Sequence, residues 1–107
     1  MNDLLSQRCR PLDGQAAMGD DEVARTLAQL SGWSVVDGML HKRFGFPDFH
    51  RTMAFVNAVA WIAHLEDHHP DLIVGYNTCT VRYATHSVGG LSLNDFICAA
   101  KVDALLA

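Results

Sequence analysis

The sequence lacks any cluster of lysine or arginine, and its 107 residues carry a formal net charge of −4. Proteins that bind phosphate backbones or anionic lipid gather positive charge on one surface, so we expect neither nucleic acid nor a membrane as a partner. The chain also has no run of about 18 or more apolar residues, and its polar N-terminus lacks the apolar segment of a signal peptide. We therefore expect a cytoplasmic protein that is neither exported nor embedded.

Cysteine is scarce, and Cys9, Cys79 and Cys98 lie far apart in the sequence. An odd, widely spaced set suits free thiols in a reducing compartment better than a disulfide framework. With 107 residues, half of them apolar, the chain is long enough for one compact core and too short for two. A single domain is the expected organisation.

The N-terminal part of the chain shows no sustained periodicity. Residues 1–19 are mixed and interrupted by glycine and proline, which predicts a loosely tethered, flexible arm before a single domain over residues 20–107. Asp20 or Asp21 can cap a first helix, and Gly32 can end it. The apolar stripe of this helix is Val23, Leu27 and Leu30.

Two further helices are indicated by capping residues and apolar rows. Residues 49–67 contain no Gly or Pro after the expected N-cap Asp48. Two helical rows in this segment are apolar: the first is Phe55, Val59 and Ile62, and the second is Ala54, Ala58, Trp61 and Leu65. A helix that packs on one sheet needs only one apolar row. The second row must therefore pack against something else, either a partner subunit or other helices of the same monomer. We favour a homo-oligomer. Ser92 and Asp95 form the pattern of a capping box that opens a final helix, and Asp95 can also orient an imidazole.

Four short runs rich in β-forming residues are the expected strands: residues 33–36, 39–46, 72–76 and 78–86. Asp37-Gly38 suits a type I′ turn between the first two runs, and Asn77 separates the other two. The predicted order is helix, two strands, helix, two strands, helix. This predicts an α+β fold, a four-stranded antiparallel sheet with helices packed on one face.

Three imidazoles, those of His68, His69 and His86, and the carboxylate of Asp95 fall on segments that this layout brings side by side. Imidazole gives and takes protons near neutral pH without large tuning, so converging histidines suit acid–base catalysis on a small molecule. Because Pro70 disfavours helical geometry at His69, the central helix should end near His68. His68 would then lie at the negative end of the helix dipole.

A metal site is the competing interpretation of these histidines. His64 and His68 are spaced i, i+4 and can share a divalent metal, with His69, His86 or Cys79 nearby. The glutamate between the first two comes one place too late for the zinc-protease order, and no paired-cysteine motif supports a metal. We expect no metal.

The chain resembles the pterin-4a-carbinolamine dehydratases over residues from about 20 to 106. The residues that stand at the spacing of that family's signature are His68-His69-Pro70, Tyr76, Thr85-His86, Gly90-Leu91 and Asp95. The resemblance implies a four-stranded antiparallel sheet with helices on one side, assembled into dimers or tetramers. It also implies that neither a metal nor another cofactor is bound.

The resemblance further implies dehydration of 4a-hydroxytetrahydrobiopterin, or a related pterin, to a quinonoid dihydropterin. The step needs a base for a ring-nitrogen proton and an acid for the departing hydroxyl. On the family pattern, His68 and His86 are acid and base in either order, His69 grips the pterin and Asp95 orients a histidine. The residues expected to contact the substrate are His69, Leu72, Thr85 and Ser87.

Three positions depart from the family pattern. His64 stands where glutamate is frequent, Leu72 replaces an aromatic residue, and Asn94 stands where animal members have arginine. The family also includes RuBisCO assembly factors of carboxysome-bearing bacteria, so a non-catalytic assembly factor with RuBisCO as its partner is the alternative. The altered positions and the apolar central helix favour that alternative, whereas the intact histidine trio favours the enzyme.

Overall fold

The computed structural model describes residues 3–107, and its elements follow the predicted order of helix, two strands, helix, two strands, helix. The α-helices are α1 (Asp20–Leu27), α2 (Phe49–Glu66) and α3 (Leu93–Ala104). The strands are β1 (Ser34–Val36), β2 (Met39–Gly45), β3 (Asp71–Val74) and β4 (Thr78–Tyr83). The described residues also form two short 3-10 helices, η1 (Leu4–Ser6) and η2 (His86–Val88). Within this part of the chain, no helix combines the length and apolar character needed to cross a membrane.

The strands form one antiparallel sheet in the order β1-β2-β4-β3, so the two hairpins meet through β2 and β4. In this central pair Leu40 lies opposite Tyr83. Asp37 and Gly38 link β1 to β2 with φ angles of 53° and 77°, the positive values that a type I′ turn requires. The predicted α+β fold is confirmed.

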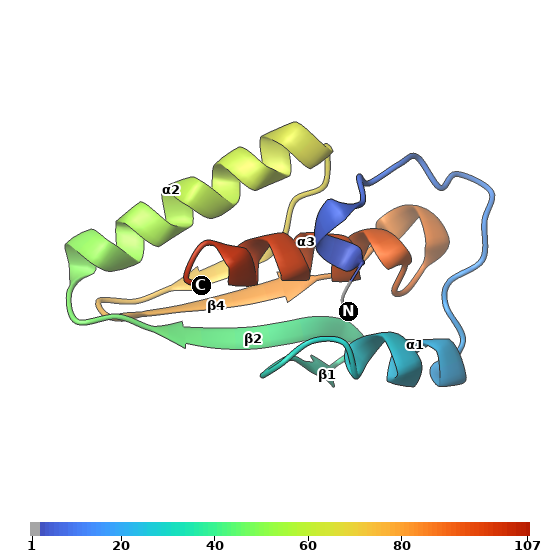
Figure 1. Ribbon diagram of the computed structural model, residues 1–107, viewed down its shortest axis with the longest axis horizontal. Coiled ribbons are helices and arrows are strands. Elements are labelled where there is room, and N and C mark those ends of the chain that lie inside the picture. Colours follow the sequence, from blue (N-terminus) through green and yellow to red (C-terminus); the bar gives the residue numbers. More distant parts are fainter. Residues whose placement is uncertain (1–2) are drawn as a thin grey trace.

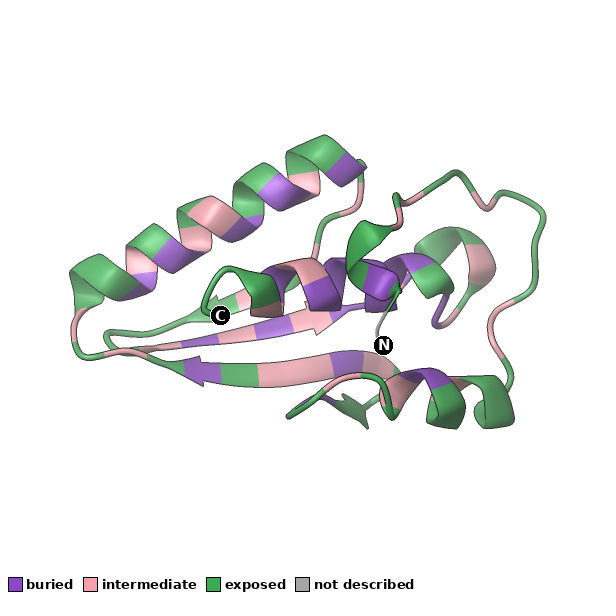
Figure 2. Ribbon diagram, in the orientation of Figure 1, coloured by how far each residue is buried: buried purple, intermediate pink, exposed green. Residues whose placement is uncertain are grey.

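Helices α2 and α3 cover the same face of the sheet (Figure 1). Along β4 the side chains alternate, and Cys79, Val81 and Tyr83 are buried beneath the helices. Figure 2 shows buried residues along the side of α2 that faces the sheet. The buried apolar residues of this helix are Phe55, Val59 and Ile62.

The second apolar row of α2 faces outward. Trp61 is 61% exposed and Leu65 is 50% exposed. No element of residues 3–107 packs over these side chains, so the arrangement in which one monomer sandwiches α2 between layers is not the one observed.

The boundaries of α1 and its caps differ from the sequence prediction. Gly19, and neither Asp20 nor Asp21, is the N-cap, and both aspartates lie inside the first turn. Acidic side chains there still interact favourably with the helix dipole. The helix ends at Leu27, before Gly32, whose φ angle is 82°.

The ends of α2 and β4 also differ from the sequence prediction, and each difference changes the element in which a histidine lies. Helix α2 stops at Glu66 because Asp67 adopts a left-handed conformation, with φ 51° and ψ 44°. Strand β4 ends at Tyr83, the last position at which it pairs with β2. His86 therefore begins η2 and is not part of a strand.

The N-terminal arm contacts the domain. Leu4 is 2% exposed, and Lys101 Nζ donates a hydrogen bond to the Leu5 carbonyl at 2.9 Å. The flexibility predicted for residues 1–19 stays a prediction, and its first two residues lie outside the described part of the chain.

Candidate active site

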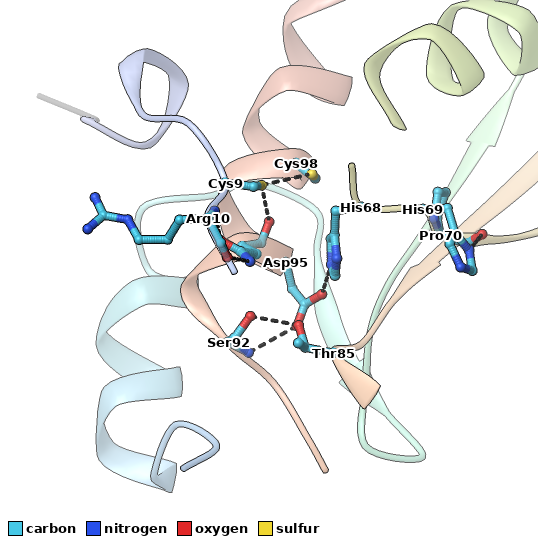
Figure 3. Close-up of polar contacts among 10 residues, drawn as sticks. Cys9, Arg10, His68, His69, Pro70, Thr85, Ser92, Asp95 and Cys98 are labelled. Carbon is cyan, nitrogen blue, oxygen red and sulfur yellow. Dashed lines mark hydrogen bonds and ion pairs between the residues drawn. The ribbon is translucent and has the colours of Figure 1, made fainter. Parts of the chain in front are cut away.

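His68 and Asp95 meet between the end of α2 and the start of α3. His68 Nε2 lies 2.6 Å from Asp95 Oδ1 (Figure 3). The His68 side chain is 12% exposed and that of Asp95 is 0% exposed, so water screens their interaction little. The left-handed turn at Asp67 ends α2 and leaves His68 outside the helix, beside α3.

Two donors fix the other carboxylate oxygen of Asp95. The Ser92 amide donates to Oδ2 at 3.0 Å, and the Thr85 hydroxyl donates to the same oxygen at 2.9 Å. The hydroxyls of Thr85 and Ser92 lie 2.6 Å apart. Because the single Thr85 hydroxyl proton goes to Asp95, Ser92 is the donor in this last bond. The predicted capping box is confirmed, and the same carboxylate orients an imidazole.

These contacts assign the proton between His68 and Asp95. Charged hydrogen bonds and the N-terminus of α3 favour an ionised Asp95, so the shared proton belongs on His68 Nε2. This tautomer is inferred from the hydrogen bonds. His68 Nδ1 has no hydrogen-bond partner within residues 3–107 and remains available to accept or donate a proton.

The imidazole of His68 also lies flat on the ring of Tyr83. The ring centroids are 5.7 Å apart and the planes differ by 12°. Burial, followed by nearby thiols and Asp95, raises the pKa of Tyr83. The phenol therefore stays protonated and serves as a packing surface for the histidine.

A cavity of about 270 Å³ opens beside His68. Its lining comes from three parts of the chain: residues 9–13 of the arm, residues 66–68, and the group Thr85, Ser87 and Asn94. A larger hollow of about 330 Å³ lies along the arm but has no histidine in its lining. Since proton transfer near neutral pH calls for an imidazole, the smaller cavity is the candidate substrate site.

The other two imidazoles do not line this cavity. His69 is exposed, with Nδ1 3.4 Å from the Pro70 carbonyl, and Figure 3 shows it apart from the His68–Asp95 pair. His86 is exposed at the start of η2. In the described chain, one imidazole and not three borders the hollow.

Some of the expected substrate-contact residues border the cavity and others do not. Ser87 and Thr85 border the cavity, although the Thr85 hydroxyl is committed to Asp95 and Ser92. Leu72 lies opposite Val81 and packs, half-buried, against the hydrophobic core.

His64, the other candidate metal ligand, stacks on Trp61, with centroids 5.1 Å apart and planes 28° apart. It therefore turns toward its own helix while His68 binds Asp95. Within residues 3–107 no group of three or more His, Cys, Asp or Glu side chains is placed to hold a metal ion.

Sequence reasoning missed two parts of the site. Tyr83 was detectable as an inward position of an alternating strand, but nothing marked it as the surface beneath His68. Residues 9–13 carry no periodic or motif signal, yet they line the cavity.

Known proteins resemble this chain over nearly its whole length. The family model described as pterin 4 alpha carbinolamine dehydratase matches residues 16–105. A relative from Nitrosospira multiformis, provisionally named pterin-4-alpha-carbinolamine dehydratase, is 51% identical over 106 residues, which cover 98% of this chain and 94% of the relative. A similarly named relative from Stenotrophomonas maltophilia is 53% identical, with 95% and 90% covered.

Two solved structures resemble the fold. A transcriptional coactivator/pterin dehydratase from Brucella melitensis has a TM-score of 0.81 and 32% identity, covering 85% of this chain and 99% of that one. A pterin dehydratase-like protein described as a RuBisCO assembly factor in the alpha-carboxysome has a TM-score of 0.56 and 28% identity, with 68% and 84% covered. By sequence and by fold, this chain belongs to the pterin 4 alpha carbinolamine dehydratase family.

Proposed function

We propose that this chain is a pterin-4a-carbinolamine dehydratase that converts 4a-hydroxytetrahydrobiopterin, or a related pterin, to a quinonoid dihydropterin. The observation that carries the proposal is the His68–Asp95 pair, which borders a cavity in a chain of the dehydratase family. A volume of about 270 Å³ lies just below the ~300–1,000 Å³ typical of small-molecule pockets and suits one flat bicyclic ring.

The reaction is a pair of proton transfers. A base removes a proton from a ring nitrogen, and the electron pair left behind forms a carbon–nitrogen double bond. The bond between the 4a carbon and its hydroxyl breaks, and an acid protonates the hydroxyl, which leaves as water. No electrons are gained or lost overall. Positioned acid–base groups typically accelerate such steps by about 10²- to 10⁴-fold.

His68 is the first of the two proton-transfer groups, because Asp95 fixes its Nε2 and leaves Nδ1 free. On the family pattern His86 is the second group, and the two histidines are acid and base in either order. His69 binds the pterin, and Leu72, Thr85 and Ser87 make further contacts with it. Ser87 has the strongest support among the last three because it is exposed and borders the cavity.

The direct test is the rate at which the pure protein dehydrates a chemically generated pterin 4a-carbinolamine. Stopped-flow absorbance follows formation of the quinonoid product, and heat-denatured protein gives the uncatalysed rate. We expect a rate that rises in proportion to native protein. A rate equal to the uncatalysed one at every protein concentration would remove the enzyme proposal.

A RuBisCO assembly factor is the second candidate. It is supported by the likeness to the assembly factor of the alpha-carboxysome and by the outward Trp61 and Leu65, which offer an apolar surface to a protein partner. If the chain has this function, adding it to refolding RuBisCO should raise the yield of assembled RuBisCO above the yield without it. Carboxysome or RuBisCO genes beside this one favour it, whereas an aromatic amino-acid hydroxylase gene favours the dehydratase.

Self-association to a dimer or tetramer is part of the proposal, and the outward apolar row of α2 is the expected contact. Light scattering after size-exclusion chromatography measures the mass, and Trp61→Glu should lower it if this row is the interface.

A cytoplasmic location is also proposed, since Cys9, Cys79 and Cys98 are all unpaired thiols.

A further inference from the structure

Arg8, Cys9 and Arg10 join the end of α2 to the start of α3. Arg8 Nε and the Cys9 amide donate to the two carboxylate oxygens of Glu66, each at 2.8 Å. The Arg10 amide donates to Asn94 Oδ1 at 3.2 Å, and Asn94 Nδ2 donates back to the Arg10 carbonyl at 2.8 Å. Three consecutive residues of the arm therefore bind both helices.

Glu66 and Asn94 are close in sequence to the proton-transfer pair. Glu66 precedes His68 by two residues, and Asn94 directly precedes Asp95. Glu66 is 8% exposed and Asn94 is 7% exposed, and every hydrogen bond that their side chains make within residues 3–107 goes to the arm. Because a buried carboxylate or amide without a partner is unfavourable, these bonds fix the arm and the two helix ends together.

The arm is also part of the cavity wall, since residues 9–13 line it together with His68. We propose that residues 8–13 form a positioning strap for the His68–Asp95 pair. The strap acts through Glu66 and Asn94: it sets the approach of α2 to α3, on which the 2.6 Å contact depends, and closes one side of the cavity. This inference rests on the proposed function for its chemical meaning, but the geometry it asserts can be tested without catalysis.

The thiol of Cys9 is a natural reporter of strap docking. Its Sγ lies 3.5 Å from Cys98 Sγ and 3.5 Å from the Asn94 carbonyl (Figure 3). The hydrogen bond with Cys9, together with burial, raises the pKa of Cys98, so the deeper thiol is slow to react. The rate at which Cys9 is alkylated therefore measures how often the strap leaves its site.

Two variants release the strap by different routes. Asn94→Ala removes both bonds to Arg10, and because alanine is the best helix former, α3 should persist. Glu66→Gln keeps the side-chain shape but loses the charge that pairs with Arg8. Asn57→Ala, at an exposed position of α2, is the matched control.

The decisive readout is the proton resonance of His68 Nε2–H, because a short bond to a carboxylate shifts that proton far downfield. We expect the resonance in the wild type and in Asn57→Ala, and its loss or upfield shift in both strap variants, with native circular dichroism in all. Cys9 alkylation, followed by mass spectrometry, should be roughly tenfold faster in the strap variants, as expected for the loss of one or two buried hydrogen bonds. If the wild type dehydrates the carbinolamine, the variants should lose kcat more than they raise KM.

An unchanged resonance and unchanged Cys9 protection in both strap variants would show the inference to be wrong, whatever the activity. A wild type that fails to dehydrate the carbinolamine, but whose resonance responds to Asn94→Ala, supports the strap and removes the proposed function instead. If one variant fails to fold, the other gives the same two measurements.

Discussion

The imidazole of His68 and the phenol ring of Tyr83 are nearly parallel, with 12° between their planes and 5.7 Å between their centroids. The flat contact, together with the bond to Asp95, restricts the ring orientation of His68. Tyr83→Phe keeps this surface and should retain nearly the wild-type dehydration rate. Tyr83→Leu removes it and should slow dehydration by roughly ten- to a hundredfold, since small displacements of a catalytic group are costly. Equal rates for the two variants would mean that the stacking has no catalytic role.

Asp95→Asn should lower both stability and rate. The buried carboxylate accepts hydrogen bonds from His68, Thr85 and the Ser92 amide, and an amide cannot accept all three. We expect a loss of about 1–3 kcal/mol in the free energy of unfolding, measured in urea. Asp21→Asn, at an exposed first-turn position of α1, is the control and should cost less than about 1 kcal/mol.

Stability should fall in acid partly through Glu66. Burial raises the pKa of Glu66, but the Cys9 amide bond and the charges of Lys101 and Arg8 outweigh it, so the net shift is downward from 4.5. A lowered pKa in the folded state gives stability that is complete above the unfolded value and is lost as the pH falls through the folded one. The gap in unfolding free energy between wild type and Glu66→Gln should therefore narrow from about pH 6 to about pH 3.5. A difference in unfolding free energy that stays constant over this pH range would contradict a lowered pKa for Glu66 in the folded protein.

The left-handed residue Asp67, with φ 51°, gives a test of the turn that leads into His68. Glycine adopts this conformation freely, so Asp67→Gly should leave stability unchanged or raise it by about 0.5–1 kcal/mol. Asp67→Val should cost about 1–2 kcal/mol or more, because a β-branched residue tolerates positive φ poorly. Thermal unfolding of both variants measures the difference, and equal melting temperatures would rule out the left-handed cap.

The fold was predictable because local signals agreed with one another. Asp37-Gly38 marked the first hairpin, Asp48 marked the start of α2, and Ser92 with Asp95 marked the start of α3. Boundaries were missed where tertiary contacts decide them. Strand β4 ends at Tyr83 because its pairing with β2 ends there, which periodicity alone does not show.

The site was predictable only in part. His68 and Asp95 were expected to converge, and they lie 2.6 Å apart. The grouping of all three imidazoles was inferred from the predicted layout, but His69 lies past the turn at Asp67 and is exposed, and His86 is exposed at the start of η2. The contribution of the arm depends on hydrogen bonds from its backbone amides to side chains that lie 57 or more positions away in the sequence, for which one sequence holds no signal.

The dehydration rate of His68→Ala, compared with wild type and Asn57→Ala at equal folded concentration, decides whether His68 transfers protons. We expect His68→Ala to lose about 10²- to 10⁴-fold of the acceleration, the usual contribution of a positioned acid–base group, while Asn57→Ala keeps it. A His68→Ala protein that is folded and dehydrates the carbinolamine as fast as the wild type would contradict the proposed mechanism.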